Sequence, residues 1–396
     1  MLKFLVKLAA DCQGQGKFRG LAWALLGLIL FSRPAAAQLD NRAFLHRSPV
    51  GPAYERQLRL DVQGFLFNKD NEYFNKIDPG LTYFGAQLAP RLVYFPTANL
   101  RLEAGVFLWK DYGTPRFKQI SPLFTLKYRQ GPHTLIFGNL EGNLHHGYIE
   151  PMFDFERVIT NRLEEGIQYQ HQTPRGSLDA WVNWVRQQYR FSNFQEEVAG
   201  GLATEHRLLG DSTGWLLKLP FQFTATHRGG QIDTIDKPLQ TLFNVATGLR
   251  LRRALASDFV SAVHFDGYVT YFNDYSFTEE LPFRDGTGVY LNAGVDTRLN
   301  NVQLAYWHGR GYVSPLGGRL YQSVSSSPVD VGYNERERQL LILRFLKDYQ
   351  LPGHLTLTTR FEPLYDLNNG LFDFSFALYL NFNQSFLLST LKRAAD

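Results

Sequence analysis

Apolar and polar residues alternate strictly along residues 371–382. The apolar positions are Phe372, Phe374, Phe376, Leu378, Leu380 and Phe382, and the small or polar positions are Asp373, Ser375, Ala377, Tyr379 and Asn381. Successive side chains of a β-strand point to opposite faces, so this strand would have one apolar face and one polar face. About eleven alternating residues are what a tilted strand needs to cross a bilayer, and the segment predicts a membrane-spanning strand.

The same period of two residues recurs along most of the chain. It predicts sixteen strands, an even number of the kind that bacterial single-chain membrane barrels contain. The predicted strands are 56–67, 80–95, 98–110, 121–130, 133–141, 163–172, 177–190, 197–209, 214–227, 240–252, 257–271, 287–299, 301–310, 336–347, 354–364 and 371–383.

The connections between these strands alternate in length. Short connections rich in turn-forming residues lie at 96–99, 130–133, 173–176, 210–213, 254–257, 300–301 and 351–353. Longer polar stretches lie between them, at 68–79, 111–120, 142–162, 188–196, 228–239, 272–286, 311–335 and 365–370. The pattern predicts an all-β fold, a transmembrane up-and-down antiparallel β-barrel of about 16 strands. Its short turns would be periplasmic and its long loops extracellular.

A soluble propeller or sandwich is the competing fold. A propeller would repeat about every forty residues, and the sequence has no such repeat. The apolar set Leu100, Leu102, Ala104, Val106 and Leu108 would leave a large exposed patch on a soluble protein unless a second sheet covered it. The membrane barrel is therefore favoured.

The N-terminal residues have the order of a secretory signal peptide. Basic residues precede the apolar run 21–31, and the small residues 35–37 follow it. The run is too short to span a bilayer as a helix. We expect a cleaved signal at 1–37, a periplasmic lead-in at 38–55 and a single outer-membrane β-barrel at 56–396.

Cleavage of this signal would change the charge balance of the chain. Five of the 41 basic residues and one of the 37 acidic residues lie in it, which leaves 36 of each. A mature chain without net charge gives no argument for nucleic-acid binding. The single cysteine, Cys12, would leave with the signal, so neither disulfides nor a thiolate metal site is expected.

The chain resembles the bacterial outer-membrane porin class in four features: the signal peptide, the number of strands, the asymmetry of the loops and the aromatic last strand. The resemblance is architectural and implies a Gram-negative outer-membrane location and passive diffusion of small hydrophilic or charged solutes through a charged lumen. It implies as partners outer-membrane lipid and lipopolysaccharide and the barrel assembly machinery, with a homo-trimer as one option for the oligomeric state. One departure is that residues 385–396 follow the predicted last strand, whereas such chains commonly end on an aromatic residue.

Alternation also predicts which charged side chains face the lumen. A wall of mixed charge implies a wet interior, because unpaired buried charges are costly. Any one of these residues could instead belong to a static ion-pair network. The candidate lumen and selectivity residues are Arg59, Asp61, Arg91, Arg101, Glu103, Arg250, His264, Asp266, Arg298, Arg360 and Glu362.

The loop after the fifth strand is the candidate constriction. In general porins the loop at this position folds into the barrel, and its acids face basic residues of the wall. By that resemblance the candidate residues are Glu150, Asp154, Glu156 and Arg157. A surface loop packed on its own aromatic residues is the alternative.

The sequence gives weaker indications of catalysis than of solute passage through the barrel. His145 and His146 lack a serine at a persuasive spacing and a further pair of metal ligands, and no phosphate-binding glycine loop is present. We therefore expect no catalytic residues, no metal, no cofactor and no enzymatic activity. The alternatives to a channel are an assembly or export component that serves as a scaffold or polymer exit, and a plugged structural barrel or lipid-boundary enzyme.

Overall fold

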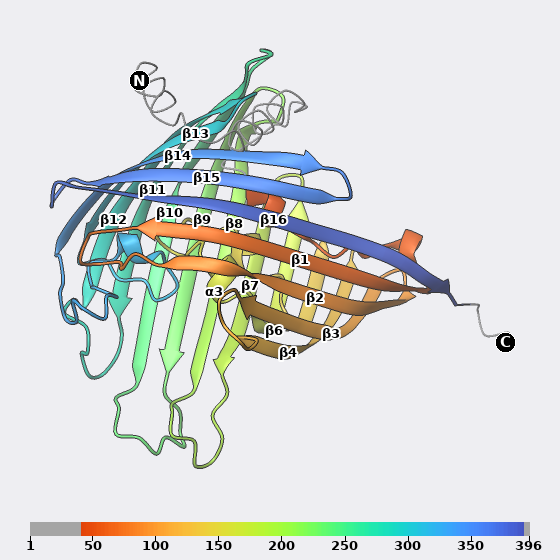
Figure 1. The fold of residues 1–396 in the computed structure, drawn as a ribbon, viewed down its shortest axis with the longest axis horizontal. Helices are drawn as coiled ribbons and strands as arrows, with labels where there is room; N and C mark the ends of the chain where they lie inside the picture. The colour runs from red at the N-terminus through yellow and green to blue at the C-terminus, as the bar shows by residue number, and fades with distance from the viewer. Residues whose placement is uncertain (1–40, 392–396) are drawn as a thin grey trace, which may run out of the picture. The chain divides into compact units, whose positions relative to one another are not determined.

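A computed structural model describes residues 41–391, which form a closed barrel of sixteen strands. Each strand pairs antiparallel with its neighbours in the sequence, and β1 (Gln57–Glu72) pairs with β16 (Leu371–Thr390) to close the ring. In Figure 1 the blue last strand lies directly beside the orange first strand. The predicted fold class is confirmed, while the predicted signal peptide at 1–37 lies outside the described residues.

The remaining strands follow the predicted order along the chain. They are β2 (Thr82–Thr97), β3 (Leu100–Asp111), β4 (Gln119–Gln130), β5 (His133–Asn139), β6 (Glu165–Thr173), β7 (Gly176–Arg186), β8 (Glu197–Gly210), β9 (Trp215–Arg228), β10 (Gln240–Ala254), β11 (Val260–Asp274), β12 (Asp285–Thr297), β13 (Asn301–Arg310), β14 (Glu337–Leu351) and β15 (Leu355–Asp366).

Helical turns are few and short. They are η1 (Asn41–Phe44), η2 (Pro52–Tyr54), η3 (Asn143–His146), α3 (Arg157–Thr160) and η4 (Arg319–Tyr321). None of these helices in the described part of the chain is long and apolar enough to cross a membrane.

Alternation of burial along the strands shows which face is which. In β16 the residues at odd positions from Asp373 to Asn381 are buried, whereas Phe372, Phe376 and Leu378 are exposed. The exposed residues form an apolar outer wall, as a lipid-facing surface requires. The buried set faces the lumen, which agrees with the face assignment made from the sequence.

Two strands, β1 and β16, extend furthest beyond their predicted ends. β16 continues to Thr390 instead of ending at 383, because its last residues pair with the start of β1, for example Leu387 with Arg59. β1 continues to Glu72 instead of ending at 67, since Asp70 still pairs with Thr82 of β2. The polar residues at 68–72 obscured the period in the sequence.

The connections confirm the predicted asymmetry. One end of the barrel carries the turns 98–99, 131–132, 174–175, 211–214, 255–259, 298–300 and 352–354. The other end carries 73–81, 112–118, 140–164, 187–196, 229–239, 275–284, 311–336 and 367–370. Short turns face the periplasm in outer-membrane barrels, so the second end is extracellular.

Candidate functional site

The loop 140–164 crosses the lumen. On one side Glu156 is 2.7 Å from the ammonium of Lys69 on β1. On the other side the Tyr148 hydroxyl donates to the carbonyl of Phe223 on β9 over 3.0 Å, and Gln222 accepts from the backbone of Ile149 over 3.1 Å. Because β1 and β9 lie half a ring apart, the loop reaches from one wall to the opposite wall.

The second long loop, 311–336, packs against the first. The backbone N–H of Asp154 donates to the carbonyl of Leu316 over 2.7 Å. The buried Tyr312 hydroxyl donates to the carbonyl of Pro151 over 3.1 Å. Two loops from distant parts of the sequence therefore support each other inside the barrel.

Glu150 lies within a cluster of arginines on the inner wall. Its carboxylate is hydrogen-bonded to Arg344 of β14 and is 3.7 Å from Arg360 of β15. Glu362 bridges the same two guanidinium groups at 2.8 and 2.9 Å. Tyr321 donates its hydroxyl to Glu150 over 2.7 Å. Two acids and two bases thus neutralise one another where the loop meets the wall.

The other three candidate residues of this loop have different surroundings. Burial, and then the charge of Glu156, raises the pKa of Asp154 to about 7. Glu156 keeps its charge beside Lys69, while Arg157 lies 3.6 Å from Glu164. The four candidate constriction residues are therefore inside the barrel. Their role in restricting passage stays a prediction.

A second charged cluster lies nearer the periplasmic end. Arg101 is 2.7 Å from Asp61 and 2.6 Å from Glu103, and Arg91 is 3.6 Å from Glu103. Arg59 donates to the hydroxyl of Ser385 over 2.7 Å. The structure brings these predicted lumen residues of β1, β2 and β3 together.

The remaining predicted lumen residues lie on the far wall. Arg250 contacts Glu205 at 2.6 Å and Asp266 at 3.4 Å, and His264 lies 4.0 Å from Asp296. Arg298, in contrast, is exposed in the turn that follows β12 and is not part of the wall. The predicted strand was two residues too long at this end, and this error extended the inward period to Arg298.

Both ring nitrogens of His146 contact acids. Its Nε2 is 2.8 Å from Glu164 and its Nδ1 is 2.8 Å from Asp179. Burial lowers the pKa of His146, but Glu164 and Asp179 outweigh this effect and raise it to about 9. Both ring nitrogens are engaged, so His146 anchors the loop and cannot accept a proton from a substrate. No group of three possible metal ligands occurs in the part of the chain that the structure describes.

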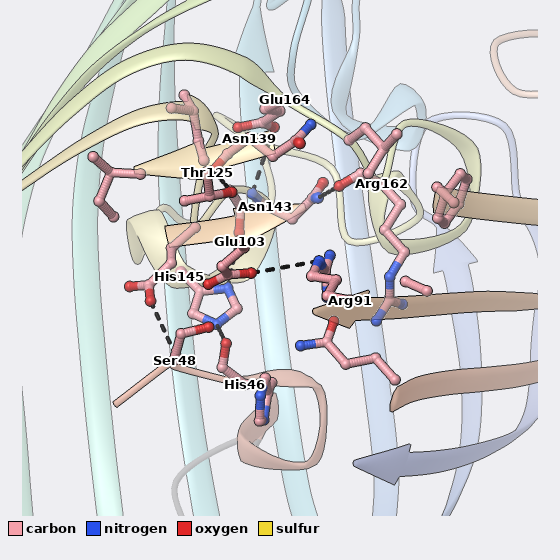
Figure 2. Close-up of a pocket in the computed structure, with 18 of the residues that line it drawn as sticks. His46, Ser48, Arg91, Glu103, Thr125, Asn139, Asn143, His145, Arg162 and Glu164 are labelled. Atoms are coloured by element: carbon pink, nitrogen blue, oxygen red, sulfur yellow. Dashed lines mark hydrogen bonds and ion pairs between the residues drawn. The ribbon is translucent and has the colours of Figure 1, made fainter. Parts of the chain in front are cut away.

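Residues 41–50, expected as part of a periplasmic lead-in, lie against this loop inside the barrel. The Phe44 ring packs edge-on against Phe155 of the loop, at 5.3 Å between centroids. The backbone N–H of Ser48 donates to Glu141 over 3.2 Å, and its carbonyl accepts from Lys127 over 2.9 Å. Figure 2 shows the cavity of about 110 Å³ that this segment, the loop and the wall enclose.

The outer wall carries a polar patch at the extracellular end of β13 and β14, formed by His308, Arg310 and Glu337. The Nε2 of His308 is 2.8 Å from Glu337, and the Nε of Arg310 is 3.2 Å from the same carboxylate. The His308 side chain is 42% exposed. The outward position follows from the register, because buried residues such as Trp307 and Arg338 alternate with them.

The sequence held a signal for this patch that we did not use. Along predicted strand 301–310 the outward set is Leu304, Tyr306, His308 and Arg310, which turns polar at the extracellular end. The predicted loop 311–335 brings Glu337 back to the same level. His308 and Glu337 meet only across neighbouring strands, so no serine–histidine motif at short spacing reveals them.

A closed antiparallel barrel with an apolar outer wall and a charged interior defines an outer-membrane β-barrel, located in the bacterial outer membrane. The family model described as lipid A 3'-O-deacylase-type matches residues 50–391. The chain therefore belongs to this lipid A 3'-O-deacylase-type family. Membership corrects the expectation that the chain has no enzymatic activity, because the description of the family names a deacylase, an enzyme that hydrolyses an acyl ester.

Solved structures with a similar fold are outer-membrane proteins. OprD of Pseudomonas aeruginosa is 13% identical with a TM-score of 0.46, and the match covers 87% of this chain and 99% of that chain. OmpT of Vibrio cholerae is 8% identical with a TM-score of 0.48, covering 82% and 97%. OccAB4 of Acinetobacter baumannii is 10% identical with a TM-score of 0.46, covering 85% and 100%. No curated protein matches the sequence.

Proposed function

We propose that the chain hydrolyses an ester-linked acyl chain of lipid A in the outer leaflet, with His308 as the general base. The observation that carries this proposal is the outward-facing pair of His308 and Glu337 beside Arg310. The patch lies at the extracellular end of the wall, the level at which lipid A meets the barrel. Family membership supplies the substrate class.

The geometry suits base catalysis. Glu337 accepts a hydrogen bond from Nε2 of His308, which leaves Nδ1 as the proton acceptor. His308 takes a proton from water as the water oxygen attacks the ester carbonyl carbon. The carbon–oxygen ester bond then breaks, and His308 returns the proton to the leaving alkoxide, so that a carboxylic acid and an alcohol are released. Glu337 stabilises the imidazolium in between.

The wall around the patch suits an acyl chain. Val289 pairs with His308 in the register and is exposed, and Leu304 and Leu341 are exposed farther toward the membrane centre. An acyl chain that lies along these side chains would bring its ester to the level of His308. Arg310, 62% exposed, is available to the anionic headgroup or to the developing oxyanion.

Mass spectrometry of lipid A from cells that express the protein tests this proposal. We expect the wild type to remove one acyl chain and His308→Asn to leave lipid A intact. His227→Asn is the matched control, because His227 is also exposed at the extracellular end and bonds Thr241 at 2.8 Å. Intact lipid A with the wild type, or equal cleavage by His308→Asn, would contradict the proposal.

A second function, passage of small hydrophilic or charged solutes, is favoured by the charged inner wall. We propose that the inner-wall arginines and the acids of loop 140–164 set the selectivity of this passage. A cavity of about 150 Å³ adjoins the loop and is lined by Asp179, Glu205 and Arg250. The loop would restrict the path, because it bonds both β1 and the opposite wall at β9.

Planar-bilayer recording separates this second function from the first. We expect small, stable conductance steps with the wild type and larger steps after deletion of residues 146–158, since the deletion removes the segment that crosses the lumen. Unchanged conductance after the deletion, or silence of both proteins at all voltages, would contradict passage through the lumen. Neither result bears on lipid A cleavage.

A further inference from the structure

Arg162 is a half-buried cation that has no counter-ion among the described residues. It follows α3 at the end of the loop that crosses the lumen, and its guanidinium lies 4.8 Å from the centroid of the Phe65 ring. Among the residues described, no carboxylate lies within ion-pair distance of Arg162, and no group accepts a hydrogen bond from its guanidinium. Figure 2 shows this side chain extending into the cavity toward Arg91.

The charges around Arg162 are already balanced. Arg91 and Arg101 are matched by Asp61 and Glu103. This group of four is neutral and leaves no acid for Arg162.

The rest of the cavity wall is balanced as well. Lys127 is matched by Glu141 at 2.6 Å. Glu164, which also lines the cavity, is paired with His146 at 2.8 Å and with Arg157 at 3.6 Å. Burial lowers the pKa of both His46 and His145, which are therefore neutral at neutral pH. The cavity keeps one uncompensated positive charge, that of Arg162.

The environment of Arg162 reflects this imbalance. Burial, and then the charge of Arg91, lowers the pKa of Arg162 to about 10. The group still carries its charge at neutral pH, at a cost that a bound anion would remove. A guanidinium binds the two oxygens of one carboxylate through two parallel hydrogen bonds.

The cavity has room for a small organic acid and walls that suit one. Its volume is about 110 Å³, against the ~10–15 Å³ that one water molecule requires. Phe44, Phe107, Ile136 and Val158 contribute apolar wall around the guanidinium. A highly hydrated dianion such as phosphate would lose water against these side chains, whereas the alkyl part of a short carboxylic acid would pack against them.

We propose that Arg162 and Arg91 form a binding site for a small monocarboxylate in the cavity between residues 44–48, loop 140–164 and the inner wall. One carboxylate supplies the single negative charge that the cavity lacks. The site is separate from the proposed hydrolytic patch, since Arg91 faces the lumen and His308 faces lipid.

Calorimetric titration of the full chain in detergent micelles tests the site, with sodium butyrate and inorganic phosphate as probes. We expect butyrate to bind once per barrel, and Arg162→Gln to weaken it about ten- to hundredfold, the value of a charged hydrogen-bonded contact. Arg284→Gln is the matched control, because Arg284 is an exposed loop arginine paired with Glu279. Heat-dependent gel mobility verifies that each variant forms the barrel.

Ala89→Leu is a second cavity variant, to be measured beside Arg162→Gln in case that variant does not fold. Ala89→Leu fills the cavity and leaves Arg162 in place, so it too must weaken butyrate. Absence of butyrate binding by the wild type, or equal binding by either cavity variant, would overturn the site. Phosphate that binds more tightly than butyrate would overturn the assignment to carboxylates.

Discussion

His146 and His308 each lie 2.8 Å from a glutamate, yet their surroundings differ in every other respect. The imidazole of His146 is fully buried, and a second acid, Asp179, occupies its other nitrogen. The imidazole of His308 is 42% exposed on the lipid-facing wall, and its Nδ1 has no partner among the residues described. His146 therefore has no free ring nitrogen for a substrate, whereas His308 has Nδ1 available.

The same contrast separates the two faces of the barrel. Apart from Arg162, the charged residues described in the lumen pair with one another, as Arg101 does with Asp61 and Glu103. Charged residues of the outer patch are few and keep open positions. A close pair of polar residues therefore indicates a catalytic site only where one of the two still has an atom free to contact a substrate.

The largest effect is expected at Glu337. Glu337→Gln removes the charge that orients His308 and stabilises its imidazolium, so lipid A cleavage should fall about 10²–10⁴-fold. The rate of acyl release, followed by mass spectrometry, measures it. Glu279→Gln, an exposed glutamate paired with Arg284, should leave the rate unchanged. If Glu337→Gln cleaved lipid A at the rate of the control variant, the patch of His308, Arg310 and Glu337 would not be the catalytic site.

The next effect concerns the interior. Glu164→Ala leaves His146 and Arg157 without their shared acid, and breaking a buried pair costs about 3–5 kcal/mol. The free energy of unfolding in urea, monitored by gel mobility, reports this loss. Stability within about 0.5 kcal/mol of the wild type would show that the buried cluster is not needed to hold the loop.

A smaller effect should follow pH. The folded protein raises the pKa of His146 from 6.5 to about 9, so its protonated form stabilises the loop. This contribution is complete below pH 6.5 and is lost as the pH rises through about 9. Histidine NMR should show His146 titrating near 9 and His46, whose pKa is lowered by burial, below 6.5. The reverse order would refute the assignment.

The smallest effect is expected at an exposed ion pair. Arg228 is 2.8 Å from Glu280, with side chains 38% and 35% exposed. Water and salt screen such a pair, so Arg228→Gln should change the unfolding free energy by less than about 1 kcal/mol. A loss as large as that from Glu164→Ala would mean that exposure does not separate the two kinds of pair.

Much of the fold follows from the sequence alone. The alternation at 371–382 correctly assigned the two faces of β16, because lipid and water impose opposite demands on successive side chains. The strand ends at Glu72 and Thr390 were missed, since polar residues interrupt the pattern while the backbone ladder continues. Backbone hydrogen bonds between strands form whatever the side chains are, so a strand can continue where the alternation of apolar and polar residues ends.

The sites were harder to predict than the strands. Lys69 was placed in a loop, so its ion pair with Glu156 could not be foreseen. Contacts of Arg162 and Glu150 depend on how two long loops pack inside the barrel, which no periodic pattern encodes. His308 and Glu337 were within reach, because strand order and register alone bring them together.

One measurement tests the central claim that chemistry lies on the outer wall and not in the lumen. It is the rate of lipid A acyl release per folded barrel for His308→Asn and His146→Asn, with the folded fraction taken from heat-dependent gel mobility. We expect His308→Asn to abolish acyl release, and His146→Asn to lower the folded fraction while the rate per folded barrel stays unchanged. Acyl release that survives His308→Asn but is lost with His146→Asn would contradict it.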